Sequence, residues 1–387
     1  MIKTLVVSTR EIDDAEAAIK EIEEQIEAQG GLKSNSVGIV ACHYEFIFAG
    51  SIKAICQALP FDVAGAISVV QAVNGDADAV LLTIMILTSD DAKFVAKLTS
   101  SLSEGAHDPI EKVYNEALAD GAGKPALALV YTPVKLSISG DRYAHIFDQI
   151  SEGVPFFGTM AIDDTGVLEH AFTIFNGEHY EDCAAMILIF ADINPQFFLA
   201  TISDDKILPT SASVTKSDGQ VLMGINGDTV NKYFENLGLS DTENNHFSLA
   251  SLPFMLDYGD GTPPVSRVFI ARTPDGYSIC AGEVPEGTTI RIGVFDRDDV
   301  VDTTTEAMKE AISVSEGASA ALMYSCISRS MSLANDIMAE IDMANKIIGD
   351  KLPFMLSDSG GEFCPTCHGD EETVNRFHNN TFIICIF

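Results

Sequence analysis

Apolar runs recur in the same order three times along this sequence. Each copy has an apolar run, a segment with helical periodicity, a proline, a second apolar run, a polar loop and a third apolar run. The copies begin near residues 37, 126 and 319. In the first two copies, glycines and a proline recur at corresponding places: Gly50 and Gly140, Pro60 and Pro155, Gly65 and Gly158. Nearly continuous apolar runs of this kind are typical of strands that are buried on both faces.

We therefore predict a mixed α/β fold. Repeated strand–helix–strand–loop–strand units are expected to form buried mixed sheets covered by helices. Strands at about 37–42, 126–131 and 320–326 are expected to occupy equivalent positions, with a helix after each; the alternative is a chance alignment of short apolar runs. An amphipathic helix is predicted near the start, with a capping box of Asp13 and Glu16. In the third copy, residues 328–349 are predicted to form one helix with a single apolar face.

The pattern of apolar and polar positions changes between the second and third copies. Residues 206–297 alternate apolar and polar positions, and turn pairs such as Asp218-Gly219 punctuate them. This region is predicted to be mostly antiparallel β structure. We place the domain boundary before it, which gives residues 1–205 as an N-terminal domain with two repeat units and residues 206–387 as a C-terminal domain.

Composition narrows the classes of partner. The net charge is −34 and no lysine or arginine cluster occurs, so nucleic acid and anionic membranes are expected to be repelled. The longest apolar runs are too short to span a bilayer, and the amino terminus has no cleavable apolar segment. A cytoplasmic protein is expected. The eight cysteines lie mostly in apolar runs, which indicates reduced, buried thiols.

Standard catalytic motifs are missing from the sequence. It has no phosphate-binding loop, no G-x-S-x-G elbow, no H-E-x-x-H pair and no G-x-G-x-x-G after a strand. We predict a binding protein without enzymatic activity, and an enzyme of unrecognised type stands as the weakest alternative.

The third copy carries the polar residues that are hardest to explain as structural. Cys326 ends a predicted strand and Arg329 begins the following helix, where free backbone N–H groups favour an anion. The alternative for Arg329 is a salt bridge with one of the many acidic residues. In the next loop, Gly361 lets the backbone approach a ligand and Glu362 is suited to an ammonium group; the alternative is an ordinary glycine turn.

A second polar segment precedes the last predicted strand. His378, Asn379 and Thr381 lie there, and such residues more often bond to backbone than to a ligand.

Five stretches of the sequence resemble the FIST family of F-box and intracellular signal transduction proteins: FDVAGAISVVQAVNG, VPFFGTMAIDDTG, VTKSDGQVLMGINGDTVNKYFENLG, LMYSCISR, and GGEFCP followed by NRFHNNTFIICIF. The resemblance covers nearly the full length. It implies a sensory module with N-terminal and C-terminal FIST domains that binds a small ligand, such as an amino acid. The positions that match the family's motifs are Cys326, Arg329, Gly361, Glu362, Cys364, Pro365, His378, Asn379 and Thr381.

The resemblance also implies partners and an alternative cofactor. Relatives occur alone or fused to chemoreceptors, histidine kinases and cyclic-dinucleotide enzymes, so we expect the signal to pass to a separate signalling protein such as a histidine kinase or chemoreceptor. No cofactor is predicted. The runner-up is a haem-based nitric oxide sensor, for which the candidate axial ligands are His43, His145, His368 and His378.

The stretch Cys364-Pro365-Thr366-Cys367-His368 spells the C-x-x-C-H pattern of c-type haem attachment. Covalent haem is disfavoured by the missing export signal, whereas a metal or redox site and a structural or ligand-lining loop stay open. We predict that Cys364 and Cys367 are reduced and metal-free. We also predict that Arg329 and Glu362 face each other across a cleft and bind a zwitterion.

Overall fold

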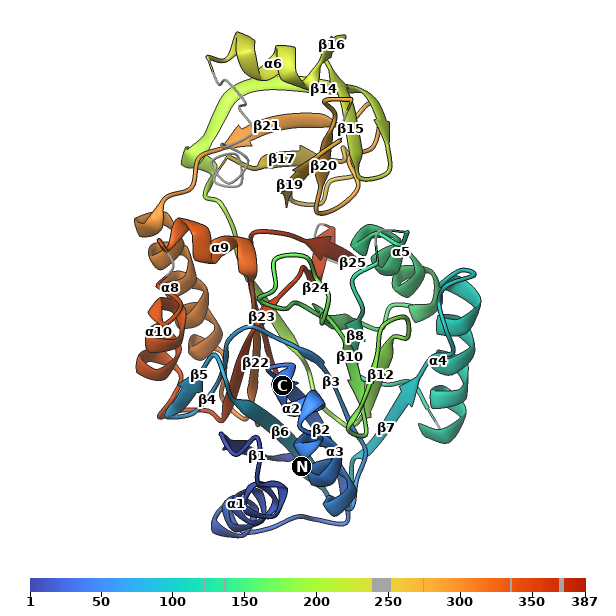
Figure 1. The fold of residues 1–387 in the computed structure, drawn as a ribbon, viewed down its shortest axis with the longest axis vertical. Helices are drawn as coiled ribbons and strands as arrows, with labels where there is room; N and C mark the ends of the chain where they lie inside the picture. The colour runs from blue at the N-terminus through green and yellow to red at the C-terminus, as the bar shows by residue number, and fades with distance from the viewer. Residues whose placement is uncertain (122, 136, 239–251, 274, 335, 369–371) are drawn as a thin grey trace.

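Three six-stranded sheets and an antiparallel barrel form the described part of the protein (Figure 1). The computed structural model describes the chain except residues 122, 136, 239–251, 274, 335 and 369–371, and it describes only the backbone of residues 367, 368 and 372. The mixed α/β fold predicted from the sequence is confirmed.

The first two repeat units have the same order of elements. The first contains β1 (Lys3–Thr9), α1 (Ala15–Ala28), β2 (Asn35–Cys42), α2 (Glu45–Phe48), α3 (Ser51–Ala58), β3 (Val63–Ile67), β4 (Gln71–Val73), β5 (Asp76–Asp78) and β6 (Leu82–Ser89). The second contains β7 (Lys93–Leu98), α4 (His107–Gly121), β8 (Leu127–Thr132), α5 (Gly140–Ser151), β9 (Phe156–Met160), β10 (Thr173–Phe175), β11 (Glu178–Tyr180) and β12 (Ala185–Phe190).

The third unit is interrupted by the barrel. It contains β13 (Gln196–Ala200), then, after the barrel, α8 (Arg297–Ser313), β22 (Ala321–Cys326), α9 (Ile327–Ser332), α10 (Ala339–Ile347), β23 (Phe354–Ser359), β24 (Glu362–His368), β25 (Glu372–His378) and β26 (Phe382–Ile386). The barrel contains β14 (Ile207–Asp218), β15 (Val221–Ile225), β16 (Asp228–Thr229), α6 (Val230–Asn236), β17 (Phe254–Asp257), β18 (Val265–Arg267), β19 (Phe269–Arg272), β20 (Ser278–Cys280) and β21 (Thr289–Gly293), with a short 3-10 turn at Asp204–Lys206 before it. The predicted β-rich region at 206–297 is therefore confirmed.

Each unit is built on a parallel pair of strands. β2 and β3, β8 and β9, and β22 and β23 pair in parallel, and β6, β12 and β26 each add an antiparallel strand beside the first of the pair. The predicted strands at 37–42, 126–131 and 320–326 are thus the equivalent strands β2, β8 and β22, each followed by a helix.

A close backbone contact recurs between the parallel strands. A Cβ on Gly65 would lie 1.8 Å from the carbonyl oxygen of Val40, and a Cβ on Gly158 would lie 1.8 Å from that of Val130. Both positions therefore require glycine, which explains why these two glycines recur in the sequence.

The units exchange their hairpins. The β4–β5 hairpin pairs with β23 of the third unit, β10–β11 pairs with β3 of the first, and β24–β25 pairs with β9 of the second. Segments on the two sides of residue 205 therefore share sheets; the division into domains at that residue stays a prediction.

The three sheets share one apolar core and carry their helices outside. Alternate residues of β8, such as Leu129 and Tyr131, join the common core with their counterparts from the other two sheets. The residues between them, such as Val130, pack with α4 and α5. The sheets of the first and third units are covered in the same way by α1 to α3 and by α8 and α10. This burial on both faces accounts for the continuous apolar runs.

Two helix predictions are corrected. The single helix expected at 328–349 is wrong, because α9 and α10 are separate and Ala334 between them has φ +55°. The predicted cap Asp13 is wrong by one residue, since Asp14 accepts the backbone N–H of Ala17 at 3.0 Å. No helix among the described residues is long and apolar enough to cross a membrane.

Candidate functional site

The predicted site residues lie near the carboxyl ends of β22 and β23, the parallel strands of the third unit. Cys326 ends β22 and precedes α9, and Glu362 begins β24 three residues after the end of β23. The backbone N–H of Cys326 donates to the carbonyl oxygen of Thr381 at 2.9 Å, which brings the two predicted segments together. All eight predicted residues, Cys326, Arg329, Gly361, Glu362, Cys364, His378, Asn379 and Thr381, are buried.

Glu362 is a fully buried carboxyl group with only part of its hydrogen-bonding capacity used. Its Oε2 accepts the hydroxyl of Thr381 at 2.6 Å, whereas Oε1 has no partner. Burial raises the pKa of Glu362 to about 8, and the hydroxyl of Thr381 and the positive charge of Arg329 act in the opposite direction. The carboxyl is therefore mostly protonated at neutral pH.

The neighbouring asparagines also carry unbonded amide atoms. Neither side-chain atom of Asn379 has a hydrogen-bond partner, and the side chain is 0 % exposed. The Oδ1 of Asn380 accepts the hydroxyl of Ser328 at 3.1 Å, but its Nδ2 is unpartnered. Buried polar groups are normally bonded, so several unpartnered donors and acceptors in two consecutive residues are unusual.

Cys326 and His378 are held in their neutral forms. Burial raises the pKa of the Cys326 thiol to about 12. Burial lowers the pKa of His378 to about 4, and its Nε2–H donates to the carbonyl oxygen of Cys364 at 3.0 Å. At neutral pH the thiol and the imidazole are therefore both uncharged.

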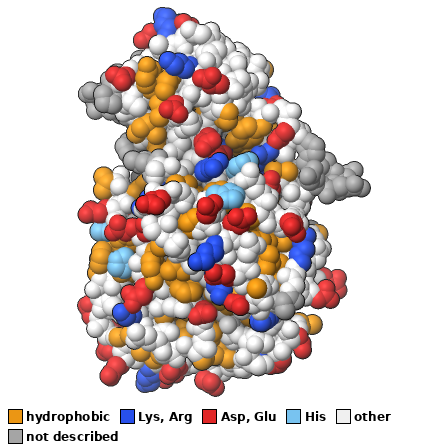
Figure 2. Space-filling model, turned by 90° about the vertical axis from the view of Figure 1, so that its right-hand side faces the viewer, with side chains coloured by type: hydrophobic (Ala, Val, Ile, Leu, Met, Phe, Trp, Pro, Cys, Tyr) orange, Lys and Arg blue, Asp and Glu red, His pale blue; other side chains and the backbone are white. Residues whose placement is uncertain are grey.

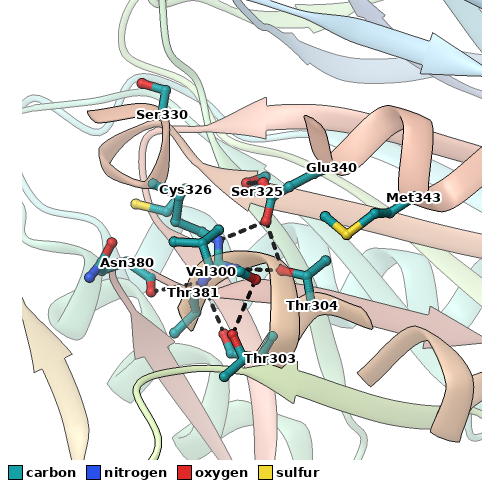
Figure 3. A network of polar contacts seen from close by, with 12 residues as sticks. Val300, Thr303, Thr304, Ser325, Cys326, Ser330, Glu340, Met343, Asn380 and Thr381 are labelled. Carbon is teal, nitrogen blue, oxygen red and sulfur yellow. Dashed lines mark hydrogen bonds and ion pairs between the residues drawn. The ribbon is translucent and has the colours of Figure 1, made fainter. Parts of the chain in front are cut away.

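Arg329 is enclosed by protein groups. Figure 3 shows the polar network to which Thr304, Glu340 and Asn380 belong. Its Nε donates to Glu340 at 2.9 Å and one terminal nitrogen donates to Thr304 at 2.6 Å. The remaining N–H groups point to the carbonyl oxygens of three residues: Ala200, Val300 and Asn380. In this structure the partner of Arg329 is therefore Glu340, and not a ligand held opposite Glu362. The sequence did not single out Glu340, because eleven positions separate the two residues along a chain that turns between α9 and α10.

The internal repeat has a neutral residue at the position that corresponds to Glu362 in the second unit. Glu362 pairs with Thr159 of β9, and Thr173 pairs with Ala66 of β3 in the same register position of the first sheet. Thr173 is thus the equivalent of Glu362 in the second unit. A neutral residue completes the same junction there, so the acidic group in the third unit is a specific addition.

The histidines proposed as axial haem ligands lie in different surroundings. The ring nitrogens of His43 contact Asp164 at 3.5 Å and the backbone N–H of Glu45 at 3.4 Å. His145 is exposed on α5, and the side chain of His368 lies outside the described residues. His378 is bonded to backbone as above, and the haem alternative stays a hypothesis.

In the C-x-x-C-H stretch, the structure describes the side chain of Cys364 but not those of Cys367 and His368. Cys364 is buried in the common core, and its thiol donates to the carbonyl oxygen of Pro365 at 3.7 Å. The side chains of Cys367 and His368 lie outside the described residues, so the reduced, metal-free state of the pair stays a prediction. No group of three potential metal ligands occurs among the side chains that the structure describes.

The site is closely packed in this structure. Cavities of about 550 Å³ and 730 Å³ lie elsewhere, the first beside Met1 and Phe387 and the second between α1 and the β4–β5 hairpin. A ligand therefore reaches Glu362 only after part of the surrounding structure moves.

Comparison with known families assigns most of the chain. Residues 36–228 match the FIST N domain and residues 228–365 match the FIST C domain. None of the curated proteins compared with the chain matches it. FIST domains are sensory domains of signal transduction. The two matches together cover more than half of the chain, and the protein belongs to the FIST family.

Proposed function

We propose that this protein is a sensory module that binds a small ligand carrying an ammonium group, with amino acids as the ligand class. The unpartnered, fully buried Oε1 of Glu362 carries the proposal. An ammonium bound there satisfies the carboxylate, while the free amide nitrogens of Asn379 and Asn380 are suited to the ligand's carboxylate.

Arg329 has a different role in this proposal from the one expected from the sequence. Its N–H groups are committed to Glu340, Thr304 and backbone carbonyls, so it is not the carboxylate-binding fork. Its positive charge still acts on Glu362 and lowers the pKa of that carboxyl against the larger effect of burial. Arg329 therefore supports ionisation of Glu362 when a ligand replaces the proton.

Ligand binding is expected to release a proton. Glu362 is mostly protonated at neutral pH and becomes ionised against the ammonium, so affinity should increase as the pH rises toward 8. Each pH unit between about 6 and 8 should strengthen binding up to about tenfold, because one proton leaves per ligand.

The experiment begins with a thermal-shift screen of amino acids and small carboxylates. Calorimetry of any hit at neutral pH, in buffers of different ionisation enthalpy, should report close to one proton released. Glu362→Gln should abolish proton release and weaken binding by tens-fold or more, in line with about 2–5 kcal/mol for a buried charged contact.

Glu310→Gln is the matched control, because Glu310 is an exposed carboxylate on α8. It should leave both affinity and proton release unchanged. A ligand that binds wild type and Glu362→Gln equally well would place the site elsewhere.

The output of the module is proposed to pass to a separate cytoplasmic signalling protein such as a histidine kinase or chemoreceptor. The neutral states of Cys326 and His378 support a binding role rather than catalysis.

A further inference from the structure

The barrel rests on the same hairpin that carries the site. Arg376 of β25 forms an ion pair with Asp260, which follows β17 of the barrel, and lies 5.1 Å from the ring centroid of Tyr258. β25 ends at His378, directly before Asn379 and Asn380. In Figure 1, β25 lies at the upper edge of the three-sheet body, facing the barrel.

A buried arginine of the barrel makes the second contact. Arg267 of β18 is 0 % exposed and pairs with Asp141 at the start of α5. It also donates to the carbonyl oxygen of Phe377 at 3.3 Å and lies over the Phe377 ring at 5.7 Å. The barrel thus holds the backbone and the side chain of the residue before His378.

Phe377 carries this contact to the site loop. A Cβ on Gly361 would lie 2.3 Å from the Phe377 ring, and a Cβ on Gly140 would lie at the same distance. The ring is therefore packed directly on the backbone of Gly361, the residue before Glu362. Movement of Phe377 away from this position frees the loop that carries Glu362.

Arg329 holds both connections between the barrel and the three-sheet body. Its guanidinium donates to the carbonyl oxygen of Ala200, which precedes the outgoing connection, and to that of Val300, which follows the returning one. The ring of Phe295, in the returning connection, lies 5.3 Å from the guanidinium. The two connections are therefore fixed at one point, beside the site.

We propose that the barrel (residues 207–293) is a hinged cover of the ligand site: it closes the site by docking Arg267 and Asp260 on α5 and the β24–β25 hairpin, and it opens by turning about the connections held by Arg329. This inference rests on the proposed function, because the cover regulates access to the same site. Ligand binding and the position of the barrel are then coupled, which gives the module a movement for a partner protein to read.

The test uses two buried cysteines as reporters, one in the site and one outside it. Cys326 ends β22 in the site, and Cys42 ends β2 in the first unit; both are buried. The full chain is treated with N-ethylmaleimide, and labelling of each cysteine is followed by peptide mass spectrometry. Because no ligand is needed, this result is independent of the experiment on the proposed function.

Arg376→Gln should accelerate labelling of Cys326 relative to Cys42 by about two- to five-fold, the range expected for loss of one partly exposed ion pair. Asp260→Asn should have the same effect through the other partner. Lys97→Gln is the matched control, since it removes a partly exposed ion pair between Lys97 of β7 and Asp120 of α4, away from the barrel, and should leave the ratio unchanged.

The ratio separates the possible outcomes. General destabilisation would increase the labelling rates of both cysteines by the same factor. If both variants give this result, so that the ratio of the two rates is unchanged, the proposed cover is wrong. An unchanged Cys326 rate in both Arg376→Gln and Asp260→Asn also overturns it. A higher ratio of Cys326 to Cys42 labelling supports the cover. If the ligand screen finds no amino acid that binds, only the proposed ligand class is wrong, and the cover is still supported.

Discussion

Arg329 and Glu362 are both buried ionisable residues of the third unit, but they differ in how many of their polar atoms are hydrogen-bonded. Arg329 is surrounded by an acidic partner, a hydroxyl and backbone carbonyls, so its burial is compensated within the protein. Glu362 keeps one oxygen without a partner and lies at a position where the second unit has Thr173. At the scale of single residues, the group with unfinished bonding is the better candidate for ligand contact.

The raised pKa of Glu362 predicts how stability changes with pH. Since the folded state favours the protonated form, this stabilisation is fully present below the unfolded pKa of about 4.5 and is lost as pH rises through about 8. Between pH 6 and 9, Glu362 should therefore cost the wild type roughly 3 kcal/mol of unfolding free energy. Glu362→Gln should remove this loss.

Urea denaturation of both proteins at the two pH values measures the effect. Other titrating groups, such as Asp358 with its pKa also raised by burial to about 8, act in both proteins and cancel in the difference. Equal pH dependence in wild type and Glu362→Gln would show that Glu362 is already ionised in the folded protein.

At the scale of elements, the third unit departs from the others in its connecting helices. The apolar periodicity of residues 328–349 continues through the break, but the chain turns at Ala334 in the left-handed region. This turn ends α9 just after Arg329 and lets α10 return with Glu340 beside it. The break is therefore part of the arrangement that pairs the two residues.

Ala334→Gly should stabilise the protein by about 0.5–1 kcal/mol, because glycine adopts positive φ without the steric cost of a Cβ. Ala17→Gly, inside α1, is the control and should destabilise it by about 1 kcal/mol. Chemical denaturation of the two variants measures both effects. A loss of stability in Ala334→Gly similar to that in Ala17→Gly would argue against the observed turn.

At the scale of the whole molecule, charge is strongly unbalanced. The chain has 57 acidic and 23 basic residues, and Figure 2 shows acidic side chains over the full height of one face. Repulsion among these carboxylates opposes the compact state and is screened by salt. The same field attracts cationic groups, which agrees with a ligand that brings an ammonium.

Raising the salt concentration from about 10 mM to about 300 mM should increase the unfolding free energy by about 1 kcal/mol, because the Debye length falls well below the size of the molecule. Denaturation in sodium chloride measures the effect, and potassium chloride at equal ionic strength is the control for a specific cation. A constant or falling stability would mean that favourable ion pairs outweigh the general repulsion.

The candidate site could be predicted in part from the sequence. The motifs around Cys326, Glu362 and Thr381 do meet in space, because each follows or precedes a buried strand of one sheet. The partner of Arg329 could not be predicted, since the contact with Glu340 depends on how two helices turn. The barrel's contacts with Arg376 and Phe377 likewise join segments that have no shared local pattern.

The sequence by itself determined the strands β2, β8 and β22 with a helix after each, the threefold recurrence and the separate β-rich region, because local periodicity and strand burial depend on neighbouring residues. Only the tertiary structure decided that the units exchange their hairpins and that the barrel docks on β25. Strand pairing across more than two hundred residues, as between β4 and β23, depends on edges brought together by the packed core. Backbone hydrogen bonds at such edges are nearly independent of side-chain identity, so no local pattern distinguishes an exchanged hairpin from one that folds back on its own sheet.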